Sequence, residues 1–187
     1  MQKTHASPSF ASPTWPTALI ALHWITVLLV VTLFALVISR EFAEDNAIRE
    51  TLLQWHRHGG LTAFWLVLVR ITLRLGAAVP YHDLPPAVRV ASRAGHGLMY
   101  VALLALPLAG YFLMCARTGH VDYFGIHLPS LIERDRDLAD TLEAVHSWMG
   151  WTLLGLVGLH AAVALWHHHV LKDNVLRSML PAGRRAA

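Results

Sequence analysis

The longest uncharged apolar stretch of this chain lies between Glu143 and Lys172. It is longer than the about 20 residues that a helix needs to cross the hydrocarbon core of a bilayer. His146 and His160 lie within it, fourteen residues apart. On an α-helix that separation is roughly 21 Å and within about 40° of a whole number of turns. Both imidazoles would therefore share a face, one near each side of the membrane, where a polar ring is costly unless it has a partner.

The composition agrees with a membrane protein. The 187 residues are 55% hydrophobic and 14% charged, whereas soluble domains carry about 25% charged residues. The only cysteine is Cys115, so no internal disulfide can form, and without a C-x-x-C-H motif the usual covalent attachment of a c-type haem is excluded. No internal repeat, P-loop, GxGxxG or zinc motif is present.

Four apolar runs predict an all-α, integral membrane four-helix bundle with helices at residues 16–39, 52–75, 95–116 and 143–170. The first run is too long for a cleaved signal peptide and lacks a small-x-small cleavage site, so we expect a retained helix. One domain, residues 16–181, would hold the bundle, between a flexible tail at 1–15 and a basic tail at 182–187.

Two of the connections are long. Residues 76–93 contain three prolines and are predicted to form a loop. Residues 117–140 form the longest predicted loop, in which the charged string ERDRDLAD is interpreted as a short surface helix.

The distribution of Lys and Arg gives the orientation, because cytoplasmic loops carry the excess. With the N-terminus inside, nine of these residues are cytoplasmic: Lys3, Arg70, Arg74, Arg89, Arg93, Lys172, Arg177, Arg184 and Arg185. Six are on the outer side: Arg40, Arg49, Arg57, Arg117, Arg134 and Arg136. The sequence therefore predicts four spans with both termini cytoplasmic.

This topology pairs four histidines by depth. His23 and His160 lie in the cytoplasmic half of the bundle, and His56 and His146 lie at its outer side. Two imidazoles from different helices can bind the iron of a haem b from both faces, with the macrocycle in the bundle core. Zinc would want four ligands. The spacing thus predicts two haem b groups stacked across the membrane, against the alternative of hydrogen-bonded packing residues.

Other histidines leave choices open. His56 and His58 point about 200° apart on a helix, so only one can face the core, and His56 has the depth of His146. His96 is a further candidate at the inner level. The run from His167 to His169 lies at the inner interface, either among lipid headgroups or lining a quinone pocket.

Several segments resemble the prokaryotic cytochrome b561 family: ALHWITVLLV, WHRHGG, AGHGLMY, VHSWMG, GLHAAVALWHHH and KDN. The resemblance extends from His23 to Pro181, and the combination of motifs is specific although each one alone is weak. Members of the family are four-helix, di-haem b proteins of the bacterial inner membrane. The resemblance implies the same fold and the same multi-pass location for this chain.

The resemblance also implies roles for individual residues. His23 and His160 would bind the inner haem iron, and His56 and His146 the outer one, which are the pairs that depth gives. His167 falls where the family's quinone region lies.

We therefore expect an oxidoreductase that carries electrons across the membrane. The members most like this chain pass electrons from superoxide to ubiquinone. The resemblance implies that superoxide, or another one-electron donor, meets the outer haem and that ubiquinone is reduced near the inner face. The expected partners are membrane lipid, the donor and ubiquinone, with no nucleic acid and no required protein partner.

Two alternatives remain open on the sequence. One is a cytochrome b electron-transfer subunit of a hydrogenase or dehydrogenase complex. The other is a haem-free, histidine-rich metal or proton transporter.

Overall fold

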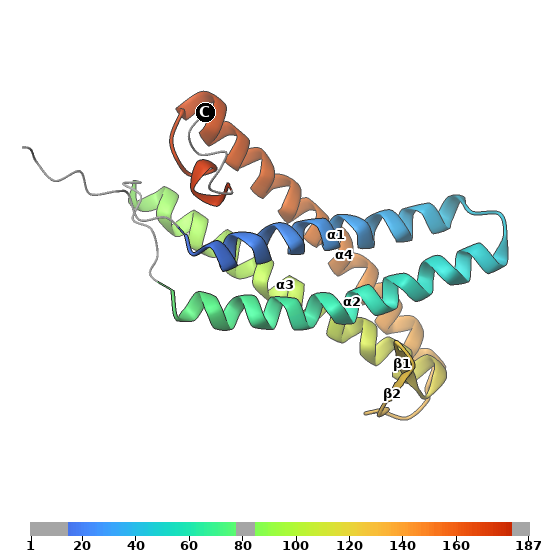
Figure 1. Cartoon of the computed structure of the whole chain (residues 1–187). Helices are drawn as coiled ribbons and strands as arrows, with labels where there is room; N and C mark the ends of the chain where they lie inside the picture. Colours follow the sequence, from blue (N-terminus) through green and yellow to red (C-terminus); the bar gives the residue numbers. More distant parts are fainter. Residues whose placement is uncertain (1–14, 78–84, 181–187) are drawn as a thin grey trace, which may run out of the picture.

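Four long helices dominate the computed structural model, which describes residues 15–77 and 85–180 (Figure 1). In chain order they are α1 (Thr17–Phe42), α2 (Asn46–Leu75), α3 (Pro86–Thr118) and α4 (Arg136–Trp166). The shorter elements are strands β1 (Val121–Tyr123) and β2 (Ile126–Leu128), a π-helical turn η1 (His167–Leu171) and a 3-10 turn η2 (Arg177–Met179). The prediction of four helices in an all-α fold is confirmed, and the β1–β2 hairpin is an addition to it.

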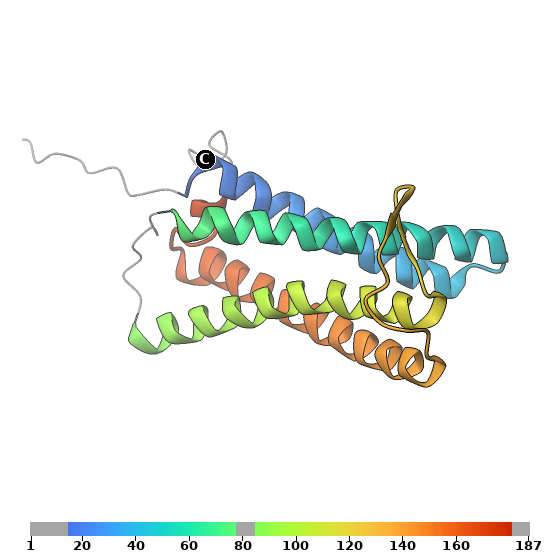
Figure 2. The same cartoon turned by 90° about the horizontal axis from the view of Figure 1, so that it is seen from below.

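The helices form two antiparallel pairs that cross each other (Figures 1 and 2). α1 packs along α2, α3 packs along α4, and α2 contacts α3. The indole Nε1 of Trp24, near the start of α1, donates to the carbonyl of Met179 in η2 at 2.7 Å. Both ends of the described chain therefore lie at the same end of the bundle, as four sequential antiparallel helices require.

A small apolar core joins the four helices at the middle of their length. Each helix contributes one buried residue, and these are Val30, Val67, Leu103 and Leu153. Outside this layer large apolar side chains face outward, among them Leu28 and Trp148, the latter 76% exposed. Apolar patches of this extent are typical of a surface that contacts lipid rather than water.

Among the described residues, three helical stretches are long and apolar enough to cross a membrane: Thr17–Phe42, Pro86–Thr118 and Arg136–Leu171. α2 does not reach that hydropathy, since Arg57, Arg70 and Arg74 lie within its apolar part.

Helices α2 and α3 begin earlier than their apolar runs indicate. α3 begins at Pro86 rather than at residue 95, because proline is tolerated in the first turn of a helix, where its missing N–H has no intrahelical partner. The predicted loop at 76–93 is therefore wrong from residue 86 onward. α2 begins at Asn46 rather than at residue 52. The Asp45 carboxylate caps this start by accepting the N–H groups of Ala47 and Ile48.

The fourth helix differs from its prediction at both ends. The Asp135 carboxylate accepts the N–H of Leu138 and caps α4, so residues 136–140 of the charged string belong to the start of α4 and not to a separate surface helix. The α-helix ends at Trp166, and the predicted remainder to residue 170 adopts the π-helical turn η1. The predicted tails at 1–15 and 182–187 lie outside the described residues, apart from Trp15.

The hairpin lies within the segment expected to be a loop. Its turn residues Phe124 and Gly125 have φ angles of 49° and 83°, and a two-residue type I′ turn needs positive φ at both positions. Such a φ is unfavourable for an aromatic residue. The Tyr123 and Thr62 hydroxyls lie 3.0 Å apart and tie β1 to α2.

Candidate functional site

The structure brings the four predicted histidines together in two pairs. At the level predicted to be the outer one, His56 of α2 and His146 of α4 have ring centroids 6.1 Å apart and ring planes at 82°. A metal held by one nitrogen of each ring would put the centroids roughly 6 Å apart, because the metal–imidazole distance is about 2 Å and the centroid lies about 1 Å behind the nitrogen. The outer pair therefore has the separation of two axial ligands.

Neighbouring helices fix the orientation of both outer rings. His56 Nδ1 lies 3.1 Å from the carbonyl oxygen of Leu33 in α1, and His146 Nδ1 lies 3.1 Å from that of Leu106 in α3. A carbonyl can only accept, so each Nδ1 carries the proton and each Nε2 keeps a lone pair. Metal-binding histidines commonly have this arrangement, in which a second partner holds the other ring nitrogen.

Glycines make room for this packing. A Cβ on Gly110 would lie 3.1 Å from His146 Cε1, so the absence of a side chain lets the imidazole rest on α3. A Cβ on Gly59 would lie 2.7 Å from Leu33 Cδ2. The Gly59 position therefore serves the α1–α2 contact that brings the Leu33 carbonyl to His56.

The inner pair is held differently. His23 of α1 and His160 of α4 have centroids 6.5 Å apart and planes at 72°, again close to the separation of two axial ligands. An Arg70 Nη lies 2.9 Å from His23 Nδ1. Since a guanidinium can only donate, Nδ1 is the acceptor there and a neutral His23 carries its proton on Nε2. Arg70 also lies over the Tyr100 ring, 5.5 Å from its centroid.

His96 of α3 is a third imidazole at the inner level. Its centroid is 5.2 Å from that of His160, closer than the roughly 6 Å of a metal-bridged pair. His96 Nδ1 lies 2.7 Å from the Ser92 carbonyl oxygen. The geometry therefore favours His23 over His96 as the partner of His160.

His167 and Asp173 form a hydrogen-bonded pair at the end of the bundle that is predicted to be cytoplasmic. His167 is buried in η1, and its Nδ1 lies 2.5 Å from the Asp173 carboxylate. Lys172, between η1 and Asp173, has a φ of 53° and turns the chain so that Asp173 faces back. The other Asp173 oxygen accepts the N–H of Val175 at 3.0 Å. A carboxylate in this position orients the imidazole and sets which ring nitrogen carries the proton.

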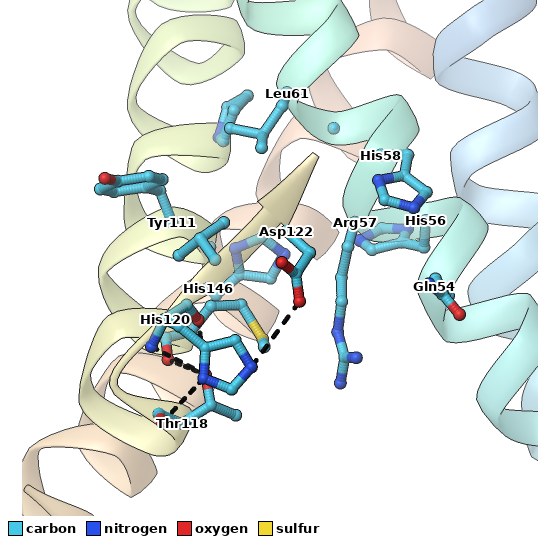
Figure 3. Close-up of a pocket in the computed structure, with 15 residues that line it drawn as sticks. Gln54, His56, Arg57, His58, Leu61, Tyr111, Thr118, His120, Asp122 and His146 are labelled. Atoms are coloured by element: carbon cyan, nitrogen blue, oxygen red, sulfur yellow. Dashed lines mark hydrogen bonds and ion pairs between the residues drawn. The ribbon is translucent and has the colours of Figure 1, made fainter. Parts of the chain in front are cut away.

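A cavity of about 170 Å³ opens beside the outer pair, between α2, α3 and the hairpin (Figure 3). In Figure 3, Arg57 and His58 project from α2 on one side, and the Tyr111 ring of α3 points away from them on the other. Its polar lining residues are Gln54, His56, Arg57, His58, Tyr111, Thr118, His120, Asp122 and His146. Sequence reasoning did not find the contributions of His120 and Asp122, because nothing in the predicted loop indicated a hairpin.

The comparisons with known proteins agree with this geometry. Residues 14–182 match the model of the family described as prokaryotic cytochrome b561. The chain belongs to this family. A protein of Yersinia pestis named probable superoxide oxidase CybB is 32% identical over 167 residues, which cover 88% of this chain and 94% of that protein.

Two proteins of Escherichia coli (strain K12) are also similar. Cytochrome b561 homolog 2 is 29% identical, covering 86% of this chain and 87% of that protein. Cytochrome b561 homolog 1 is 28% identical, covering 87% and 94%. Membership of the cytochrome b561 family implies haem b cofactors and supports transmembrane electron transfer, and with three candidate spans it indicates a bacterial membrane protein.

The residues of this cytochrome b561 fit haem b. Each level offers two imidazoles from different helices at the separation of axial ligands, and Gly110 provides space beside one of them. Among the described residues, no group of three or more His, Cys, Asp or Glu side chains is arranged to hold a metal ion.

Proposed function

We propose that this cytochrome b561 carries electrons across the membrane through two b haems, oxidising superoxide at the outer face and reducing ubiquinone at the inner face. His56 and His146 would hold the outer haem, and His23 and His160 the inner one. Each bound haem would supply an iron that gains and loses one electron. The observation that carries the proposal is the outer pair, 6.1 Å between centroids with both Nδ1 atoms held by carbonyls.

At the inner level the proposal requires Arg70 to move. For His23 to bind a metal through Nε2, its proton must be on Nδ1, and the guanidinium that now donates to Nδ1 must then leave it. The released Arg70 would be a charged donor for a carboxylate of the inner haem. Arg74 is a weaker candidate for that role, since it lies over the Trp15 ring at 4.3 Å.

Ubiquinone reduction at the inner interface would use His167. Quinone reduction consumes protons, and a buried imidazole that is oriented by Asp173 is suited to deliver one. Protons would reach this turn through the adjacent half-buried His168.

The proposal also includes four spans, with both termini in the cytoplasm of the cell and the chain in the inner membrane. α2 would cross despite its arginines, because Arg70 contacts His23 and Tyr100 inside the bundle rather than lipid. Arg57 pairs with Glu50 at 2.9 Å near the outer end. Charged side chains in a span are tolerated when they face the bundle interior or reach the interface.

A two-stage assay tests this function. The purified protein should show a b-type spectrum on reduction with dithionite. A superoxide source should then reduce the haems and, with ubiquinone added, sustain turnover that superoxide dismutase abolishes. Haem reduction that persists with dismutase would rule out superoxide as the donor, and co-purification of a larger redox enzyme would favour the electron-transfer subunit. A colourless protein would overturn the haem assignment.

A further inference from the structure

His58 is buried, and one of its ring nitrogens has no hydrogen-bond partner. The residue is 9% exposed, and Nδ1 is shielded from solvent with no hydrogen-bond partner in the described structure. An unpaired buried N–H is rarer and costlier than an unpaired acceptor. The neutral ring therefore carries its proton on Nε2, which is left as its only donor.

The aromatic residues around His58 hold the ring in place. Phe124 stacks on it with centroids 4.5 Å apart and planes at 20°. Tyr123 and Trp55 meet it edge-on at 6.2 Å and 6.4 Å. Phe124 holds this position from a turn with positive φ, and strained residues of this kind persist where the surrounding structure enforces them, often at ligand sites.

The ring that is fixed in this way lines the outer cavity next to His56 and His146. Arg57 lines the same cavity and makes an ion pair with Glu50 through one of its two terminal nitrogens. The cavity's carboxylate, Asp122, is paired with His120 at 3.7 Å and with His127. Arg57 keeps its second terminal nitrogen, and His58 its Nε2–H, as donors for a ligand in this cavity.

We propose that the outer cavity is an oxyanion site in which His58 Nε2–H and the Arg57 guanidinium bind a carboxylate or a small oxyanion. Charge-assisted bonds from such donors are the strong ones. Two sources supply this chemistry: a propionate of the outer haem and a soluble anion that approaches it. The inference rests on the proposed outer haem and extends it to residues that are not ligands.

Local donors matter at this end because the surrounding charge is unfavourable to anions. In the predicted orientation, ten of the twelve acidic residues lie at the outer side with six arginines. A net negative surface does not steer an anion by its long-range field. Recognition then depends on short-range donors, which is what His58 and Arg57 provide.

Redox titration of the purified holoprotein tests a propionate as the ligand. His58→Leu removes the donor, and His58→Gln retains an N–H near the Nε2 position. With a propionate as ligand, His58→Leu should shift one haem's reduction equilibrium constant about tenfold toward the oxidised form, about 59 mV for one electron. The other haem should not shift, and His58→Gln should restore most of the wild-type value.

Stopped-flow reduction by superoxide tests the soluble source. With a soluble anion as ligand, both potentials stay unchanged in His58→Leu, and the rate of haem reduction falls about tenfold and recovers in His58→Gln. Thr51→Val is the control on the same helix, because the exposed Thr51 hydroxyl donates within α2 to the Ala47 carbonyl at 2.8 Å. It should change neither measurement.

Three results would overturn the oxyanion site: no change of potential or rate in His58→Leu, an equal shift of both haems, or the same change in Thr51→Val. A normal wild-type b-type spectrum with any of these results leaves the proposed electron transfer standing. Absence of that spectrum in the wild-type protein contradicts the proposed function itself.

Discussion

His146 and His160 lie on the same helix but have different neighbours, His56 for the first and His23 for the second. If each binds its own haem, His146→Ala and His160→Ala should each halve the ratio of haem to protein. The spectrum of the remaining haem should differ between the two variants. Haem extraction and redox titration measure both effects. Loss of both haems from a variant that keeps its helical circular dichroism would contradict separate sites.

Gly110 tests how closely the outer ring must approach α3. Gly110→Ala would place a methyl group 3.1 Å from His146 Cε1, and overpacking of this kind costs about 1–3 kcal/mol. We expect weaker retention of the outer haem, measured as faster loss to apomyoglobin, with the inner haem unaffected. Gly155→Ala on α4 is the matched control, because no atom lies within 4 Å of its added Cβ. Equal loss from both variants would mean that the close approach has no role.

At the scale of elements, the turn η1 orients the His167 side chain toward Asp173. Asp173→Asn keeps an oxygen for the Val175 N–H but removes the charge that orients the imidazole. We expect ubiquinone reduction to slow about tenfold, the lower end of the usual effect of losing such a partner. Haem reduction by superoxide in a single turnover should be unchanged. His169→Gln, at an exposed position in η1, should leave both rates unchanged, and an effect of similar size there would argue against the dyad.

The helices and the histidine pairs could be predicted from the sequence because both follow from periodicity and depth. An apolar run indicates a helix, and its length indicates a level in the membrane for each histidine. The same signal misses helical turns outside the apolar part. The predicted starts of α3 and α4 are therefore later in the chain than the observed ones. Pro86 and the cap Asp135 mark those starts, but prolines and acids also occur in loops.

The hairpin and the cavity could not be predicted in this way. Strands of three residues are too short for an alternating pattern, and the turn places Phe124 at a φ that its residue type disfavours. The burial of His58 depends on that hairpin, so its role could not be assigned from α2 alone. The contact between Arg70 and His23 links α1 and α2 across 47 positions, and only the packing of the two helices shows it.

At the scale of the whole molecule, the apolar layer of Val30, Val67, Leu103 and Leu153 lies between the two histidine levels. Charges are expensive in such a layer, so it would favour the transfer of electrons over the passage of ions. In a bundle of four spans, the same separation would put the two pairs near opposite faces of the membrane. The direction of electron flow then depends on which end of the bundle faces the cytoplasm.

Cysteine labelling can determine that orientation. In a Cys115→Ser background, which removes the buried native thiol, Ser130→Cys would mark the hairpin end and Asn174→Cys the end with both described termini; both positions are exposed. The excess of Lys and Arg at the second end predicts that it is cytoplasmic. A membrane-impermeant maleimide should therefore label the position 130 variant in intact spheroplasts and the position 174 variant only after permeabilisation. The reverse pattern would put His167 on the outer face and overturn ubiquinone reduction at the cytoplasmic side.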